Sequence, residues 1–174
     1  MGAEALIQAH SNQKLDKKIN FHVLNSLDSN SVSKVLNLIK PNSSKFLAIS
    51  KSGKTTETIA ILLVVIEWLL KNDIKVDESV MVMCENINNT ENALMKIVHQ
   101  YSLKAIQHTN IGGRFSVLSS TGLLPAAIMG LDLYSLRNAA RRSLSNIFDN
   151  SALILSSSVF SKINNVPEKL NCII

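Results

Sequence analysis

Hydrophobic residues along the chain follow two patterns, short continuous apolar runs and apolar positions at helical spacing. A helix is predicted after Asp28 or Ser29, either of which caps it, and before Pro41, which ends it. Further helices predicted from spacing and apolar content cover residues 2–9, 56–71, 90–101, 117–130, 132–148 and 150–163. The predicted strands are the short runs at residues 21–24, 45–49, 79–84 and 104–108, with the start of another at 171–174.

Strands that alternate with helices in this way predict an α/β fold, in which helices cover both faces of a parallel sheet. In such doubly wound sheets, ligands bind beyond the carboxyl ends of the strands. Two polar turns, residues 50–55 and 110–115, directly follow predicted strands. Both turns therefore lie at the end of the sheet where a binding site is expected.

The composition is that of one ordinary folded domain. The chain has 174 residues, of which 46% are hydrophobic and 18% are charged. These values argue against intrinsic disorder, and the length suffices to bury a core. Only six glycines and three prolines are present, which argues against a collagen-like chain and an all-β chain with many turns.

The net charge and the spacing of basic, histidine and cysteine residues limit which kinds of ligand or macromolecule the chain is expected to bind. The 18 basic and 13 acidic residues give a net charge of +5, which leaves an anionic partner open. Nucleic-acid binding is not predicted, because the basic residues are scattered and aromatics make up only 5%. No metal site is predicted either, since the four histidines are isolated from one another and from Cys84 and Cys172.

A membrane-spanning segment is not predicted from the sequence. The longest apolar run, residues 59–70, contains Glu67 and is shorter than the span of about 20 residues that a bilayer requires. The N-terminal residues also lack the basic and apolar regions of a signal peptide. We therefore expect a cytoplasmic protein with reduced cysteines.

The first polar turn has the composition of a phosphate site. Hydroxyl and ammonium groups gather around a glycine where the backbone must turn, and a predicted helix begins directly after them; the residues concerned are Ser50, Lys51, Ser52, Gly53, Lys54 and Thr55. The free N–H groups and the dipole at a helix N-terminus favour a bound phosphate. A solvated capping turn is the simpler alternative. A nucleotide-binding P-loop is a weaker one, because Ala48 stands where that motif has glycine.

The second polar turn runs from Gly112 and Gly113 through Arg114 to an apolar segment with Gly122 and Pro125. Paired glycines let the backbone approach a ligand closely, and an arginine there could stabilise an oxyanion. Together the two segments, residues 49–58 and 112–125, resemble the signature sequences of glucose-6-phosphate isomerases. The first segment is shared by sugar isomerase (SIS) domains in general, whereas the Gly-Gly-Arg segment is more specific to the isomerases.

The resemblance implies a flavodoxin-like, doubly wound SIS domain and an isomerase that uses neither a metal nor an organic cofactor. It implies that Arg114 stabilises the enediolate and that Glu57 has a supporting catalytic role. Ser50, Lys51, Ser52, Thr55 and Gly113 would bind glucose 6-phosphate or fructose 6-phosphate, and Lys54 replaces the threonine usual in bacterial members.

The resemblance also implies that residues 1–174 are one truncated N-terminal SIS domain. The family's first strand and its Gly-Ile-Gly-Gly-Ser turn are expected before Gly2, and its second SIS domain, with the base glutamate, after Ile174. We therefore expect no isomerase activity from this chain alone. A non-catalytic sugar-phosphate-binding module is the alternative. The family implies a homodimer, and complementation by separate chain fragments is a further expectation.

Overall fold

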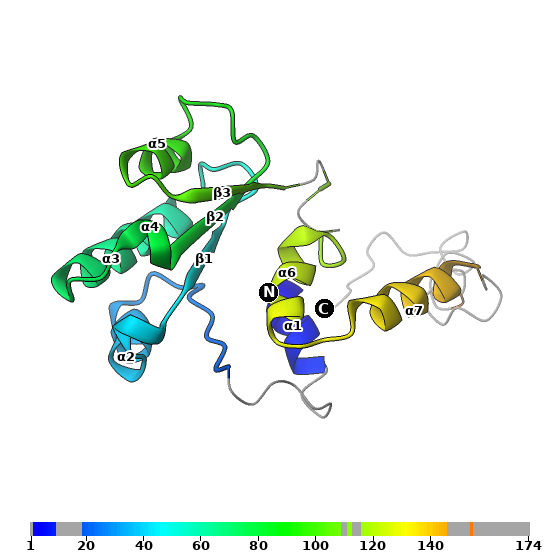
Figure 1. The fold of residues 1–174 in the computed structure, drawn as a ribbon. Helices are drawn as coiled ribbons and strands as arrows, with labels where there is room; N and C mark the ends of the chain where they lie inside the picture. The colour runs from blue at the N-terminus through cyan, green and yellow to red at the C-terminus, as the bar shows by residue number, and fades with distance from the viewer. Residues whose placement is uncertain (1, 10–18, 109–110, 113–115, 146–153, 155–174) are drawn as a thin grey trace, which may run out of the picture. The chain divides into compact units, whose positions relative to one another are not determined.

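The structure is a computed structural model that describes residues 2–9, 19–108, 111–112, 116–145 and 154 (Figure 1). The chain divides into two compact units, Met1–Leu131 and Asp132–Ile174, and each is described by itself. Several predicted features lie outside the described residues: most of the helix at 150–163, the strand start at 171–174, and the site residues Gly113 and Arg114.

The first unit alternates helices and strands as the hydrophobic pattern predicts. Its elements are α1 (Gly2–Ala9), α2 (Ser29–Leu38), the 3-10 helix Pro41–Ser43, β1 (Phe46–Ile49), α3 (Thr56–Lys71), α4 (Val76–Ser79), β2 (Val80–Cys84), α5 (Ala93–Gln100), β3 (Lys104–Gln107) and α6 (Ser120–Ile128). Helix α1 packs against α6, although the two are far apart in sequence. Asp28 caps α2, its side chain accepting a hydrogen bond from the Ser31 N–H, which confirms one of the two predicted caps.

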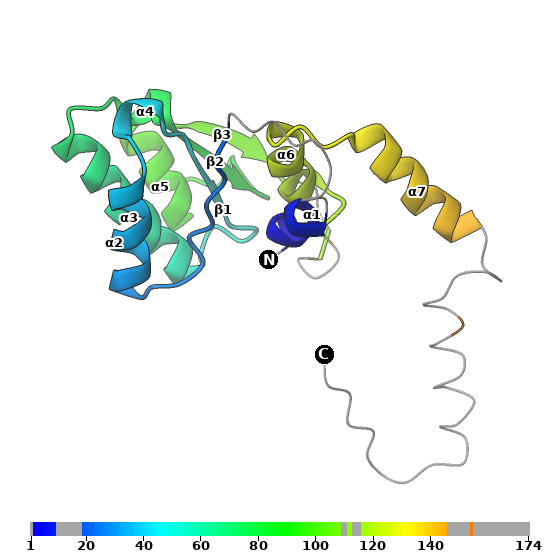
Figure 2. The ribbon, with the colours of Figure 1, turned by 90° about the horizontal axis from the view of Figure 1, so that it is seen from below.

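The three strands form one parallel sheet in the order β1-β2-β3. Val82 at its centre pairs with Ala48 of β1 on one side and with Ala105 of β3 on the other. Because β1, β2 and β3 are neighbours in chain order, right-handed crossovers place α3 and α5 on the same face of the sheet. Figures 1 and 2 both show α2, α3 and α5 gathered on that side. The predicted α/β fold with a parallel sheet flanked by helices is thus confirmed.

The core lies between the sheet and these three helices. Along β2, Val80, Val82 and Cys84 alternate with Met81 and Met83 and enter the core cluster together. Alternate residues of a strand point to opposite faces, so β2 presents its first, third and fifth side chains to the helices. The helices contribute most of the remaining buried residues: Val32, Leu36, Ile61, Leu62, Val65, Ile66, Leu69, Leu94, Met95, Ile97 and Val98.

Helix α3 is the longest element described, with 16 residues. Its buried residues recur three or four positions apart and face the sheet. Glu67 lies on its surface, where it pairs with Lys71 one turn later at 2.6 Å, and this hydrogen-bonded lysine lowers the pKa of the Glu67 carboxyl. None of the described helices is long and apolar enough to cross a membrane.

The predicted strand at residues 21–24 is wrong. These residues form neither strand nor helix, and the sheet comprises only β1, β2 and β3 among the described residues. Leu24 still packs against the core cluster, whereas His22 is exposed. A short apolar run therefore marks contact with the core here, and contact of that kind needs no ladder of backbone hydrogen bonds.

The second unit contributes α7 (Leu133–Ser145), as the pattern at 132–148 predicts. Asp132 begins this helix, because its Oδ1 accepts hydrogen bonds from the N–H groups of Tyr134 and Ser135 at 3.0 and 3.1 Å. The hydroxyl of Ser135 donates to Oδ2 at 2.6 Å, and these bonds lower the pKa of the Asp132 carboxyl. Helix α7 buries none of its own residues.

Candidate functional site

The carboxyl ends of the three strands bring three segments side by side. The N–H of Ser50 donates to the carbonyl of Met83 at 3.0 Å, and that of Glu85 donates to the carbonyl of Lys51 at 3.0 Å. On the other side of β2, the N–H of His108 donates to the carbonyl of Cys84 at 2.8 Å. The sheet ladder therefore continues two residues past β1 and one residue past β2 and β3, and it fixes where Lys51, Glu85 and His108 leave the sheet.

The first polar turn, residues 50–55, is a tight loop closed by its own hydroxyls. Ser50 is 3% exposed, and its Oγ donates to Thr55 Oγ1 at 3.0 Å. The N–H of Gly53 donates to Ser50 Oγ at 3.1 Å and to the Ser50 carbonyl at 3.3 Å. Gly53 has a φ of +65°, a conformation that side chains other than glycine rarely adopt. This closure turns the chain sharply from β1 into α3.

Asn92 holds this loop from a different part of the chain. Its Nδ2 donates to the carbonyl of Ser52 at 2.8 Å, while its Oδ1 accepts from the N–H of Leu94 at 3.0 Å and caps α5. The Leu94 N–H also donates to the carbonyl of Gly53 at 3.2 Å. A Cβ added to Gly53 would collide with the Asn92 side chain. The loop conformation therefore depends on the start of α5, in a contact that residue types alone do not reveal.

The N-terminus of α3 follows this loop directly. Thr55 occupies the N-cap position, but its side chain makes no capping hydrogen bond. The first N–H groups of an α-helix have no partner within the helix, and they carry the positive end of its dipole. The side chains of Ser52, Lys54 and Thr55 are exposed beside these groups. The arrangement has the donors and the positive charge that an anion requires.

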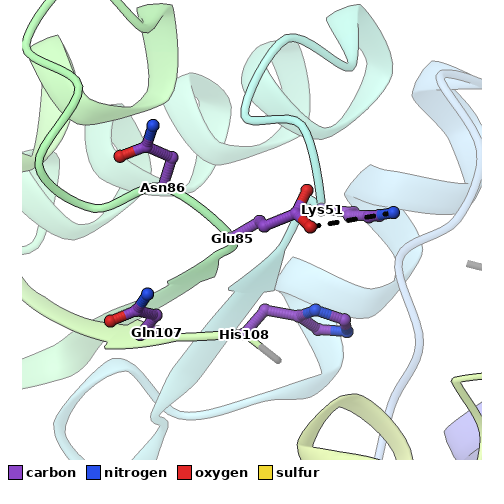
Figure 3. Close-up of a pocket in the computed structure, with 5 residues that line it drawn as sticks. All are labelled: Lys51, Glu85, Asn86, Gln107 and His108. Atoms are coloured by element: carbon purple, nitrogen blue, oxygen red, sulfur yellow. Dashed lines mark ion pairs between the residues drawn. The ribbon is translucent and has the colours of Figure 1, made fainter. Parts of the chain in front are cut away.

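An open pocket of about 670 Å³ lies next to this loop. Its lining residues are Lys51, Glu85, Asn86, Gln107 and His108. Lys51 Nζ lies 3.9 Å from Glu85 Oε1, in a pair whose side chains are 37% and 30% exposed. In Figure 3, the side chains of Lys51, Glu85 and His108 extend to one side of the strand ends, and Asn86 and Gln107 lie on the other. Lys51 thus belongs to both the loop and the pocket.

The segment before α6 is stabilised by local hydrogen bonds. The carbonyl of Ser116 accepts hydrogen bonds from the Ser119 and Thr121 hydroxyls at 2.6 and 3.0 Å. Gly122 is required there, because a Cβ at this position would collide with the carbonyl oxygen of Val117. Pro125 lies inside α6, within the helix predicted around it.

The predicted site residues have different outcomes. The structure brings Ser50, Lys51, Ser52 and Thr55 together in one loop, with Ser50 buried and its hydroxyl engaged inside the loop. Glu57 lies exposed in the first turn of α3. Gly113 and Arg114 are outside the described residues, so their roles stay predictions, as do those of the loop residues.

Sequence reasoning missed three residues that shape this region: Asn92, Glu85 and His108. Asn92 lies inside the helix predicted over residues 90–101, whereas in the structure it precedes α5 as its cap and is 2% exposed. His108 was expected to be an ordinary sheet residue, whereas it follows β3 and lines the pocket. An available signal was position, since each polar residue directly after a parallel strand lies at the binding edge.

No group of three or more metal-binding side chains (His, Cys, Asp or Glu) gathers anywhere in the described part of the chain. Cys84 is a free thiol and is fully buried. Its Sγ lies 3.6 Å from the Lys51 carbonyl and 3.7 Å from Asn92 Nδ2. The thiol therefore packs beneath the loop as part of its support.

Comparison with known proteins identifies a family for this chain. The sequence model of the phosphoglucose isomerase family matches residues 1–154. The chain belongs to the phosphoglucose isomerase family. The glucose-6-phosphate isomerase of Thermus thermophilus is 33% identical over 147 residues, which are 82% of this chain and 33% of that protein. The enzyme of the same name from Carboxydothermus hydrogenoformans is 33% identical over 122 residues, 70% of this chain and 26% of its own length.

The fold agrees with this family assignment. A crystal structure of a hypothetical protein from Thermus thermophilus superposes with a TM-score of 0.69 and 30% identity, over 82% of this chain and 34% of that one. This phosphoglucose isomerase family member thus spans about a third of the length of the curated relatives that it matches. The resemblance drawn from residues 49–58 and 112–125 is confirmed at the level of the family.

Proposed function

We propose that this chain binds a sugar phosphate, glucose 6-phosphate or fructose 6-phosphate, as one part of a glucose-6-phosphate isomerase. The observation that carries the proposal is loop 50–55, which closes on itself and leads into the uncapped N-terminus of α3 at the carboxyl edge of a parallel sheet. The family's cytoplasmic location and its homodimer belong to the same proposal. So does a chemistry that needs neither a metal nor an organic cofactor.

The phosphate would lie against the N-terminal N–H groups of α3. Lys51, Ser52 and Thr55 present one ammonium group and two hydroxyls to that position, and Lys54 adds a second exposed cation. A phosphate dianion accepts hydrogen bonds from all of these groups, and charge-assisted bonds are the stronger kind. Ser50, with its hydroxyl directed into the loop, would act by holding the loop closed around the phosphate.

The reaction proposed for the family's complete active site is an aldose–ketose isomerisation. A carboxylate base removes the proton from C2 of the open-chain sugar, and negative charge develops on the enediolate oxygens. The guanidinium of Arg114 would stabilise that charge, and Glu57 would support the reaction from the first turn of α3. The same base then returns the proton to C1, which gives the ketose. We propose that this base is not among residues 1–174, so the chain alone binds without turnover.

Calorimetry on the purified chain tests the binding step. Fructose 6-phosphate is expected to bind, and Lys51→Ala should weaken binding by about tenfold, because it removes a charged partner of the phosphate. Lys34→Ala is the matched control, since Lys34 is an exposed lysine on the remote helix α2. Equal loss in both variants, or no binding by the unmodified chain, would contradict the proposal.

An activity assay distinguishes a chain that only binds the sugar phosphate from a chain that also isomerises it. A coupled assay for fructose 6-phosphate formation should show no activity with the chain alone, as a non-catalytic binding module also would. Turnover that disappears in Arg114→Ala would instead show that residues 1–174 contain a base of their own. The expected result is binding without turnover.

A further inference from the structure

The two lysines of loop 50–55 differ in their electrostatic partners. Lys51 also lines the neighbouring pocket, and its Nζ lies 3.9 Å from Glu85 Oε1 in an ion pair at the strand ends (Figure 3). Lys54, the other lysine, is exposed and forms no ion pair with any residue that the structure describes. Of the two cations next to the proposed phosphate position, one is therefore already paired with a carboxylate.

The backbone holds the Glu85 carboxylate beside Lys51. The N–H of Glu85 donates to the Lys51 carbonyl at 3.0 Å, so the two residues lie opposite each other where β1 and β2 end. The distance of 3.9 Å between the charged groups is too long for a hydrogen bond, and the side chains are 37% and 30% exposed. Ion pairs of this kind are weak, because water screens them. Glu85 thus stays near Lys51 through its place in the sheet and not through a strong bond.

A phosphate bound at loop 50–55 would compete with Glu85 for this lysine. An ammonium group forms short charge-assisted hydrogen bonds with phosphate oxygens, and its present contact with Glu85 provides none. The carboxylate also carries the same sign of charge as the ligand and repels it. Among the described residues that line the pocket, only Glu85 is acidic. It is therefore the pocket side chain that opposes phosphate binding.

We propose that Glu85 is a positioning residue that holds Lys51 in the empty site and lowers the affinity of loop 50–55 for phosphate. The inference rests on the function proposed above and adds the residue that adjusts its strength. Binding of phosphate transfers the Lys51 ammonium group from the carboxylate to the phosphate oxygens. A weaker phosphate contact need not slow an isomerase, because equal binding of substrate and transition state does not accelerate the chemical step.

Glu85→Gln tests the proposal, because the amide keeps the shape of the side chain and removes its charge. Calorimetry with inorganic phosphate should show binding about three- to fivefold tighter than in the unmodified chain, the range expected for a partly exposed ion pair. Glu78→Gln is the matched control, since Glu78 pairs with Lys75 at 2.9 Å before β2, at the opposite end of that strand. Both substitutions change the net charge equally, so a difference between them reports a local effect of Glu85.

A double-mutant cycle separates competition for Lys51 from repulsion of the phosphate. In a Lys51→Ala background the shared cation is gone, and Glu85→Gln should tighten phosphate binding by less than about twofold. In a Lys54→Ala background the ion pair is intact, and the full three- to fivefold gain should remain. Glu85→Asp, whose shorter side chain draws the carboxylate back from Lys51, should have an affinity between those of the unmodified chain and Glu85→Gln.

The Lys51 side chain supplies a signal that a merely structural role of Glu85 would not move. Its Cε resonance, identified by its loss in Lys51→Ala, should shift when inorganic phosphate binds. Without ligand, the same resonance should shift in Glu85→Gln and not in Glu78→Gln. Circular dichroism establishes that each variant is folded.

The outcomes distinguish this inference from the proposed function. No phosphate binding by either the unmodified chain or Glu85→Gln overturns the proposed function, and the inference with it. Phosphate binding that Glu85→Gln weakens, or leaves within about twofold, overturns only the inference about Glu85. An equal gain with and without Lys51 also overturns it, because Glu85 would then act on the phosphate directly and not through the lysine.

Discussion

Two serine-rich turns of the first unit each lead into an apolar helix, but different contacts hold them. Loop 50–55 is tied to another element, because Asn92 donates to the Ser52 carbonyl at 2.8 Å from 40 residues away. The turn before α6 is tied to itself, since the Ser116 carbonyl accepts the hydroxyls of two residues that follow it closely. The shape of the first turn therefore depends on the start of α5, whereas these hydrogen bonds of the second turn come from its own residues.

Gly53 and Gly122 show the same difference between the two turns. A Cβ on Gly53 would meet the side chain of Asn92, which belongs to the start of α5, and a Cβ on Gly122 would meet the carbonyl of Val117, five residues back in its own turn. Only Gly53 also has a positive φ, of +65°. A ligand bound to loop 50–55 would consequently be coupled to the packing of β2 and α5, both of which contribute buried residues to the core.

The largest effect is expected from Gly53→Ala. The substitution combines backbone strain at a positive φ with a collision against a buried side chain, and each of these costs about 1–3 kcal/mol. We expect unfolding in urea to show a loss of about 3 kcal/mol and phosphate binding to disappear. A stable Gly53→Ala variant with normal phosphate affinity would show that Asn92 does not confine the loop.

Gly122→Ala is the matched control for this comparison. It introduces the same methyl group against a backbone carbonyl, but in the locally held turn. Thermal unfolding should detect a smaller loss, about 1–2 kcal/mol, as the start of α6 shifts to make room. Phosphate affinity should remain within about twofold of the unmodified chain, because no contact of loop 50–55 is disturbed.

The second prediction concerns Asn92. Asn92→Ala removes the cap of α5 and the donor to Ser52, with an expected loss of about 1–3 kcal/mol in the free energy of unfolding. Phosphate affinity should fall about tenfold through the loosened loop. Asn92→Asp separates the two roles, because its carboxylate still accepts from the Leu94 N–H but cannot donate to the Ser52 carbonyl.

Calorimetry with inorganic phosphate, alongside urea unfolding, measures both effects in these variants. Asn92→Asp should retain the α5 cap and therefore most of the stability, yet lose phosphate affinity. Should Asn92→Asp bind phosphate as the unmodified chain does, the contact across 40 residues would have no part in shaping the site.

The elements that could be predicted are those in which local pattern and burial agree. Helix α3 begins and ends where the apolar spacing indicates, at Thr56 and Lys71, because its buried face is a local feature of the sequence. The same reasoning predicted a strand at residues 21–24, and that prediction was wrong. Leu24 packs against the core cluster, although its segment does not pair with β1.

The candidate site could likewise be predicted only where local composition and position indicate it. Loop 50–55 is recognisable by its composition and by its place after a strand, and both are visible in the sequence. Asn92 could not be found in this way, because its importance comes from the Ser52 carbonyl and from Gly53, which the fold alone brings to it. The pairing of Lys51 with Glu85 likewise depends on the parallel register of β1 and β2.

The smallest expected effect is a difference in pH response between a helix cap that carries a charge and one that does not. Hydrogen bonds from the hydroxyl and N–H of Ser31, at 2.6 and 2.9 Å, hold the pKa of Asp28 below its usual value of 3.8. A depressed folded-state pKa contributes stability that is present above the unfolded value and lost as the pH falls through the folded one. Asn92 caps α5 with an amide and has no such dependence. An acid titration followed by NMR, from about pH 6 to about pH 2, should therefore shift the Ser31 amide before that of Leu94. Asp28→Asn, which keeps a cap without its charge, should abolish the early shift. If both amide signals shifted together in the unmodified chain, α2 and α5 would not be capped independently. The distinction between contacts within one segment and contacts between distant segments would then not hold even for these two helix caps.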